Sequence, residues 1–219
     1  SFQPNKKFEG KGFNALALLL YKQKKKEEYL MIYDVLEYGA KADGVTNDAA
    51  AIQKAIDECS AAGGGQVVLR SGRTYYSSSI IIKPYVDLHL ERGSVLKAHS
   101  DLTTYFHPNE GQKDNGVKIE GTPVTLKPSY AFIYAKDADH MAITGDGVID
   151  GNAFAFVKQV SQYYVTGDFY PRPTVIYVEH CNHINFTNII IRNVSFWTLH
   201  TAGCDDVLID RIRILNDLN

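Results

Sequence analysis

Apolar and polar positions along the chain follow a helical period first and a β-type period afterwards. Residues 48–62 carry apolar side chains spaced to share one face of a helix, namely Ile52, Ala55, Ile56 and Cys59. Short β-type runs follow at 67–69, 80–82 and 87–90. The pattern over residues 34–70 therefore predicts a strand, a tight turn, a helix and a strand, after which we expect almost only strands.

The ends of this helix have recognisable signals. Thr46 or Asn47 can accept backbone N–H bonds as the N-cap, and Asp48 suits the positive end of the helix dipole. The glycines at 63–65 end the helix, because glycine enters left-handed geometry cheaply. We expect this helical segment to cover one end of the structure that follows.

Three later segments repeat one another. IYVEHCNHINFTNIIIRN at 176–193 aligns with LHTAGCDDVLIDRIRILN at 199–216 and with IYAKDADHMAITGDGVID at 133–150. The alignment predicts three apolar columns and one polar column. The apolar columns are Met141, Ile184 and Val207; Ile143, Phe186 and Ile209; Val148, Ile191 and Ile214. The polar column is Asp150, Asn193 and Asn216.

A period of about two dozen residues is typical of a parallel β-helix or a leucine-rich repeat. The apolar columns hold Ile, Val and Phe instead of leucines at fixed positions, and the turns carry Asn, Asp and Gly. Like residues on stacked coils would fill the bore, and Asn193 could link its amide to that of Asn216 one coil away. We therefore predict an all-β fold, a right-handed parallel β-helix with an N-terminal α-helical cap at about 34–70.

Residues 1–30 differ from the rest of the chain. They combine early lysines, the apolar run ALALLLY and the charged run KQKKKEE, but no small-residue cleavage site follows. We expect a disordered or artefactual leader, followed by one β-helix domain at 31–219 that is incomplete at its C-terminal end. Translation starting at Met31 would leave no room for an export signal, which favours a cytoplasmic location over the alternative, secretion. Three cysteines, too few for a disulfide scaffold, fit a reducing compartment.

Charge and hydropathy narrow the classes of partner. The formal net charge is −2, with 23 Lys and Arg against 25 Asp and Glu, so no basic surplus points to nucleic acid. No apolar run approaches the ~18 residues of a membrane span. We expect neither a nucleic acid nor a membrane as a partner.

Four segments of the chain form recognisable motifs: VLEYGAKADGVTNDAAAIQKAI, GDGVIDGN, RPTVIYVEHCNHI and FWTLHTAGCDDVLI. Together they resemble the polygalacturonases, glycoside hydrolase family twenty-eight. The first is shared with the wider pectate-lyase superfamily, whereas the RP and FWTLH elements are more specific to pectin hydrolases. The resemblance covers about residues 32–219 and implies hydrolysis of α-1,4 links of polygalacturonan by inversion, without a metal or other cofactor. It implies polygalacturonan or oligogalacturonides as the partner.

The catalytic signature of that family is not found in this chain. In relatives it comprises Asn-Thr-Asp, Asp-Asp, Gly-His-Gly and Arg-x-Lys, on coils that follow the position matching RIRILNDLN. Asp205-Asp206 aligns with the turn positions Asn182-His183 and Asp139-His140 of the repeat, so a turn role outweighs a catalytic one. We assign no catalytic residue and expect no hydrolytic activity from this chain alone.

Three residues are candidates for substrate contact. By the resemblance, Trp197 and His200 in FWTLH line the sugar-binding groove, where Trp can stack on a sugar and protonated His can donate to a carboxylate. Alternatively, Trp197 packs between coils and His200 is its exposed neighbour. Arg172 could meet a uronate carboxylate or, slightly favoured, bond a backbone carbonyl. Cys181 and Cys204 share a column and are expected as stacked thiols, with no metal site.

Two other functions stay open. A polysaccharide lyase would need bound Ca²⁺ and an Arg or Lys base. A carbohydrate-binding or structural β-helix would do no chemistry. Because LNDLN offers no obvious cap, we also expect self-association at the open C-terminal end.

Overall fold

The computed structural model describes residues 31–108, 128–157, 159–160, 165–166 and 172–216. The leader expected at residues 1–30 lies outside these ranges. Among the described residues, no helix combines the length and apolarity needed to cross a lipid bilayer.

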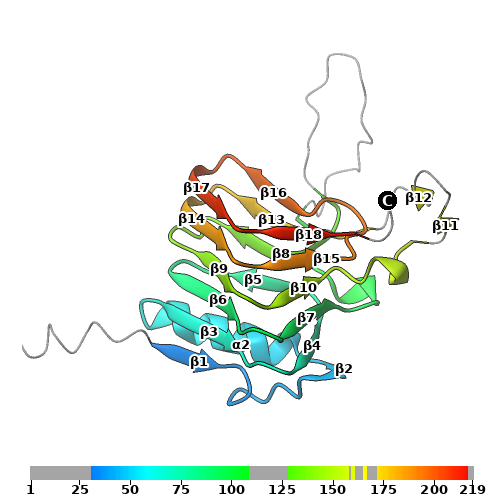
Figure 1. Cartoon of the computed structure of the whole chain (residues 1–219). Helices are drawn as coiled ribbons and strands as arrows, with labels where there is room; N and C mark the ends of the chain where they lie inside the picture. Colours follow the sequence, from blue (N-terminus) through cyan, green and yellow to red (C-terminus); the bar gives the residue numbers. More distant parts are fainter. Residues whose placement is uncertain (1–30, 109–127, 158, 161–164, 167–171, 217–219) are drawn as a thin grey trace, which may run out of the picture. The chain divides into compact units, whose positions relative to one another are not determined.

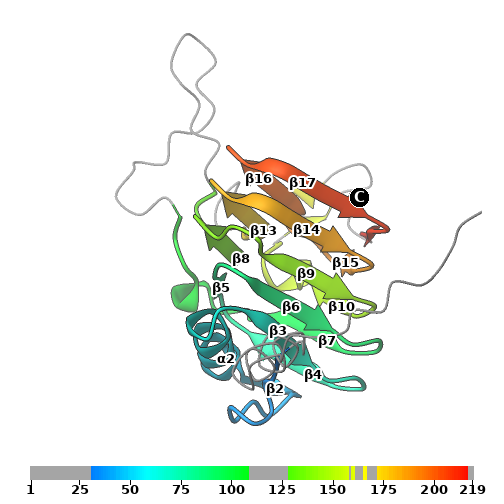
Figure 2. The same ribbon diagram turned by 90° about the vertical axis from the view of Figure 1, so that its left-hand side faces the viewer.

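The strands form three parallel sheets, which we name A, B and C (Figures 1 and 2). Sheet A contains, in spatial order, β1 (Ile32–Asp34), β3 (Gly65–Leu69), β6 (Val86–Leu90), β9 (Ala142–Gly145), β14 (Asn182–Thr187) and β17 (Asp205–Asp210). Sheet B contains β2 (Asp43–Asn47), β4 (Thr74–Ser77), β7 (Val95–Ala98), β10 (Val148–Asp150), β15 (Ile190–Arg192) and β18 (Arg213–Leu215). Sheet C contains β5 (Ile80–Ile82), β8 (Ala131–Lys136), β13 (Thr174–Glu179) and β16 (Leu199–Ala202).

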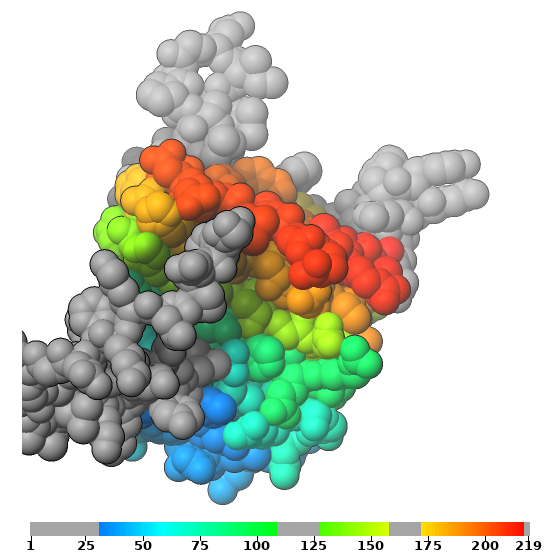
Figure 3. All heavy atoms as spheres, turned by 60° about the vertical axis from the view of Figure 1, so that its left-hand side comes forward, coloured from blue at the N-terminus to red at the C-terminus, as the bar shows by residue number. Residues whose placement is uncertain are grey.

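Each full coil passes through sheets C, A and B in turn, as β13, β14 and β15 do before β16, β17 and β18. The space-filling view changes colour from blue at the first strands to red at the last coil, because successive coils stack in chain order (Figure 3). The predicted right-handed parallel β-helix is confirmed. Short elements outside the coils are the 3₁₀ helices η1 (Leu102–Thr104) and η2 (Ala153–Ala155) and the antiparallel pair β11 (Gln159–Val160) and β12 (Val165–Thr166).

The bore is filled by side chains that point inward from all three sheets. Ile133, Ile143, Phe186 and Ile191 are fully buried in one continuous cluster. Burying each such side chain stabilises the fold by roughly 1.5–3 kcal/mol relative to exposure. The 23-residue offset holds in the structure, because Ile184 pairs with Val207 and Phe186 with Ile209.

The alignment of residues 133–150 with residues 176–193, which lie 43 positions apart, needs one correction. Ile143 pairs with Phe186 as the repeat predicts, but Val148 pairs with Ile190 and not with Ile191. The column of the repeat therefore contains Ile149, and our placement of Val148 was wrong by one residue. The cause is the turn after β9, which is one residue longer than the turn after β14. Val148 follows Ile143 by five positions, whereas Ile190 follows Phe186 by four.

The polar column also differs from expectation. Asn193 Nδ2 donates to the carboxylate of Asp150 at 3.1 Å, while Asn216 Oδ1 accepts from the Val194 backbone N–H at 2.9 Å. The expected amide link from Asn193 to Asn216 is therefore wrong. The register shift pairs Asp150 with Arg192, and a carboxylate is a stronger acceptor than a neutral amide.

The helix α2 (Ala49–Ala61) covers the first coils, as predicted. Its buried residues are the four expected from the periodicity: Ile52, Ala55, Ile56 and Cys59. Asn47 Oδ1 accepts from the Ala49 backbone N–H at 3.1 Å, whereas the N-cap residue Asp48 bonds the backbone N–H groups of Lys41 and Ala42. Asp48 thus holds the preceding turn and does not cap the helix with its side chain.

The same helix closes the free edge of sheet C. The side-chain amide of Gln53 accepts from the Ile81 backbone N–H at 2.8 Å and donates to the Ile81 carbonyl at 2.9 Å. Gln53 therefore replaces a neighbouring strand at β5. An exposed edge would otherwise leave these backbone groups open to another chain.

The last coil, made of β16, β17 and β18, lies at the opposite end of the stack from α2 (Figure 1) and exposes apolar side chains. Leu208, Ile209, Ile214 and Leu215 are each about half exposed. Within the described residues, β16, β17 and β18 are each bonded to a neighbouring strand on one side only.

Candidate functional site

The outer face of sheet C carries a column of aromatic side chains. Tyr134, Tyr177 and His200 occupy equivalent positions on β8, β13 and β16. Side chains alternate along a strand, so these three point away from the bore that receives Ile133 and Ile176. Ring centroids lie 5.9 Å apart for Tyr134 and Tyr177 and 5.0 Å apart for Tyr177 and His200. We call this set the aromatic column.

Trp197 lies at the end of the aromatic column, in the turn between β15 and β16. Its indole is perpendicular to the His200 ring at 4.6 Å and stacks on Phe196 at 5.0 Å. Trp197 is 37% exposed, so it is not packed entirely between coils. The part of its ring that reaches solvent is available to stack on a sugar.

His200 is held in a half-buried position. Its Nδ1 atom is buried and has no hydrogen-bond partner among the residues that the structure describes. Burial lowers the pKa of His200 below its ordinary value. The imidazole is therefore mainly neutral near pH 7, and the protonated donor considered from the sequence is disfavoured.

Arg172 takes the second of the two roles that its sequence context left open. Its Nη1 donates to the Ser195 carbonyl at 3.0 Å, and its guanidinium lies 5.3 Å from the centroid of the Phe196 ring. Arg172 thereby fixes the turn that carries Trp197. The structure brings the three sequence candidates together through Phe196, although they come from two different coils.

A charged pair that was not predicted from the sequence lies beside the aromatic column. Glu179 is only 2% exposed, and its carboxylate accepts from the hydroxyls of Tyr134 at 2.6 Å and Tyr177 at 3.2 Å. Burial, reinforced by Glu179, raises the pKa of both tyrosines, so both remain donors. Lys136 Nζ lies 3.8 Å from Glu179. The sequence contained enough information to predict this pair, because the aligned segments IYAK and IYVE place Tyr134 beside Tyr177 and Lys136 beside Glu179.

A cavity of about 460 Å³ opens at the α2 end of sheet C. It is bounded by Gln53 of α2, by Ile81 of β5 and by the segment Thr103–Phe106. The Phe106 ring also stacks on Tyr134 at 4.5 Å. The cavity and the aromatic column therefore share Phe106 as a common wall.

The remaining sequence candidates lie away from this face. Asp206 has a φ of +51°, and its carboxylate lies 2.6 Å from His183 Nδ1 in an exposed position on sheet A. Asp205-Asp206 thus begins β17 and does not lie in a turn as predicted, although the left-handed φ of Asp206 is typical of turn residues. Cys181 and Cys204 are free thiols, and burial raises the pKa of Cys181 to about 11. In the described ranges, no group of three or more His, Cys, Asp or Glu residues is arranged to hold a metal ion.

Comparison with known proteins relates this chain to polygalacturonases. A probable polygalacturonase of Vitis vinifera is 25% identical over 189 residues, which cover 83% of this chain and 36% of that protein. A polygalacturonase of Ralstonia nicotianae is 34% identical over 114 residues, covering 50% of this chain and 20% of that protein. The chain thus spans about a third or less of the length of these relatives.

A solved structure supports the fold. The hyperthermoactive exopolygalacturonase of Thermotoga maritima superposes with a TM-score of 0.66 at 22% identity, covering 86% of this chain and 48% of that one. The family described as rhamnogalacturonase A/epimerase, pectate lyase-like, matches residues 32–213. The chain therefore belongs to this family, and its resemblance to the polygalacturonases is confirmed.

Proposed function

We propose that the chain is the substrate-binding part of a pectin-degrading glycoside hydrolase that cleaves α-1,4-galacturonosyl links with inversion. The observation that carries the proposal is the partly exposed Trp197 indole at the end of the aromatic column. The Tyr134 and Tyr177 rings are only 5% and 1% exposed, so the stacking contact with a sugar falls to Trp197. Polygalacturonan or its oligomers are the ligands that the family suggests.

We further propose that this chain alone does not hydrolyse the polymer. Inverting hydrolysis uses two carboxyl groups ~6.5–9.5 Å apart. The four strands of sheet C contain one carboxylate, Glu179, which is buried and bonded by two tyrosines. Asp205-Asp206 lies on sheet A.

We predict saturable binding of hexagalacturonate without release of reducing ends. Trp197 is the single tryptophan of the chain, so its fluorescence should change as the sugar binds. In calorimetry, Trp197→Ala should weaken binding by about 2- to 10-fold, the value of an aromatic contact. Phe154→Ala is the matched control, because Phe154 is 62% exposed but lies outside sheet C.

Each outcome bears on a separate part of this proposal. Absence of binding by the wild-type chain would overturn the substrate class. Released reducing ends would overturn the lack of hydrolysis, and an unsaturated, ultraviolet-absorbing product would favour a lyase instead.

We also propose that the exposed last coil associates with a second copy of the chain. Its strand edges and apolar side chains can pair with another copy. Light scattering should show dimers or larger species, and the double variant Ile209→Lys/Ile214→Lys should shift them towards monomer. The control variant Val45→Lys should not change the oligomeric state, because Val45 lies at the other end of the stack, where it is 77% exposed. A monodisperse wild-type monomer would contradict the proposal.

A further inference from the structure

The strands of sheet C carry only two charged side chains. Their sequences are III, AFIYAK, TVIYVE and LHTA, so Lys136 and Glu179 are the only Lys, Arg, Asp or Glu residues among them. The two residues pair directly across β8 and β13. This pair therefore supplies the formal charges of the strands of sheet C.

The two charges differ in their access to solvent. Glu179 is almost completely buried and is bonded by the hydroxyls of Tyr134 and Tyr177. The side chain of Lys136 is 45% exposed, and its Nζ is 3.8 Å from the nearer carboxylate oxygen. No hydrogen bond of this ammonium group occurs within the described part of the chain. The surface therefore presents the cation, while the carboxylate lies beneath it.

The other cationic candidates of the face are less available. Burial keeps His200 mainly neutral, and Arg172 is engaged with the Ser195 carbonyl and the Phe196 ring. In the adjoining turn, Asp137 and His180 lie 4.0 Å apart and are both well exposed. Lys136 therefore has the donors and the permanent charge that an anionic ligand needs.

We propose that Lys136 binds a carboxylate of an acidic polysaccharide, and that buried Glu179 is the counter-charge that holds the ammonium group at the surface. This inference rests on the proposed function and adds a specificity determinant to it. A buried carboxylate attracts the ammonium but cannot itself approach the ligand. The face then selects free uronate over its methyl ester, because esterification removes the charge that Lys136 contacts.

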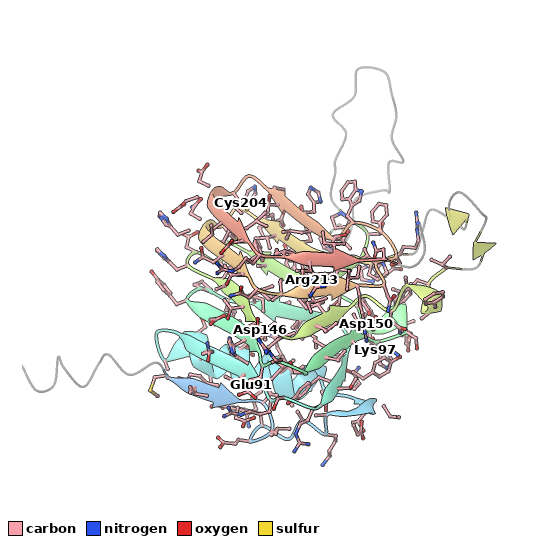
Figure 4. All side chains as sticks on the ribbon, viewed as in Figure 1. Glu91, Lys97, Asp146, Asp150, Cys204 and Arg213 are labelled. Atoms are coloured by element: carbon pink, nitrogen blue, oxygen red, sulfur yellow. The ribbon has the colours of Figure 1, made fainter. Side chains whose placement is uncertain are left out.

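The test compares hexagalacturonate with its fully methyl-esterified form, using calorimetry on the whole chain. Lys136→Met should weaken binding of the acid by about 10-fold or more, as expected for a hydrogen bond to a charged group. Binding of the ester should change less than about 2-fold, and Lys136→Arg should retain most of the affinity for the acid. Lys97→Met is the matched control, because Lys97 lies on sheet B (Figure 4).

The double variant Lys136→Met/Glu179→Gln guards against misfolding, because it removes both charges of the pair together. It should show the same selective loss, with an unchanged melting temperature confirming the fold. Equal binding of the acid by wild type and both variants would overturn the role of Lys136 while leaving the proposed function intact. An equal loss of affinity for the acid and for the ester in the Lys136→Met variant would likewise overturn the role of Lys136. Failure of the wild-type chain to bind the acid would overturn both.

Discussion

Replacing Gly145 with alanine should lower the free energy of unfolding by roughly 2–5 kcal/mol. Gly145 has a φ of +106°, where an L-residue costs about 1–2 kcal/mol. A Cβ at this position would also overlap the backbone carbonyl of Leu90 on the preceding coil. Overpacking of this kind adds about 1–3 kcal/mol, because the backbone of β6 must move. Urea denaturation measures the loss through the transition midpoint.

Gly63→Ala separates backbone strain from coil contact. Gly63 has a nearly equal φ of +97°, but a Cβ there would meet no atom within 4 Å. This variant should lose only the strain of about 1–2 kcal/mol. Equal losses for the two glycines would contradict the claim that close approach of coils fixes Gly145.

Replacing Asp150 with alanine should lower the free energy of unfolding by about 2–4 kcal/mol. Asp150 is 5% exposed, and its carboxylate accepts from Arg192 Nε at 2.9 Å, from Asn193 Nδ2 and from the Asn152 backbone N–H. Its removal leaves these donors without their acceptor. Because Asn193 precedes the turn that carries Trp197, the fluorescence of the single tryptophan should change as well.

Asp146→Ala is the control for Asp150→Ala. Both aspartates belong to the GDGVIDGN motif and are labelled in Figure 4. The Asp146 side chain is 52% exposed, and its partner Arg92 is 85% exposed at 2.9 Å. An exposed ion pair contributes less than about 1 kcal/mol. Chemical denaturation that gave similar losses for both variants would show that Asp150 has no special structural role.

The resemblance to the polygalacturonases predicted the candidate substrate contacts, which the residue types alone could not have identified. The FWTLH and RP elements predicted Trp197, His200 and Arg172 as candidate contacts, and the structure places these residues around Phe196. The protonation state of His200 depends on how deeply neighbouring coils bury it, and no sequence pattern reports that depth. The hydrogen-bond partner of Arg172, the Ser195 carbonyl, was equally beyond prediction, because it lies 23 residues further along the chain and its position depends on the path of the next coil.

The sequence by itself determined the coils and their cap. Its 23-residue offset placed Phe186 over Ile209 correctly, and its helical period identified the buried face of α2, because both patterns arise from the local geometry of the chain. Only the tertiary structure decided the pairing of Val148 and the environment of Glu179. One additional residue in a turn shifts every partner that follows, and burial depends on what several coils together place around a side chain.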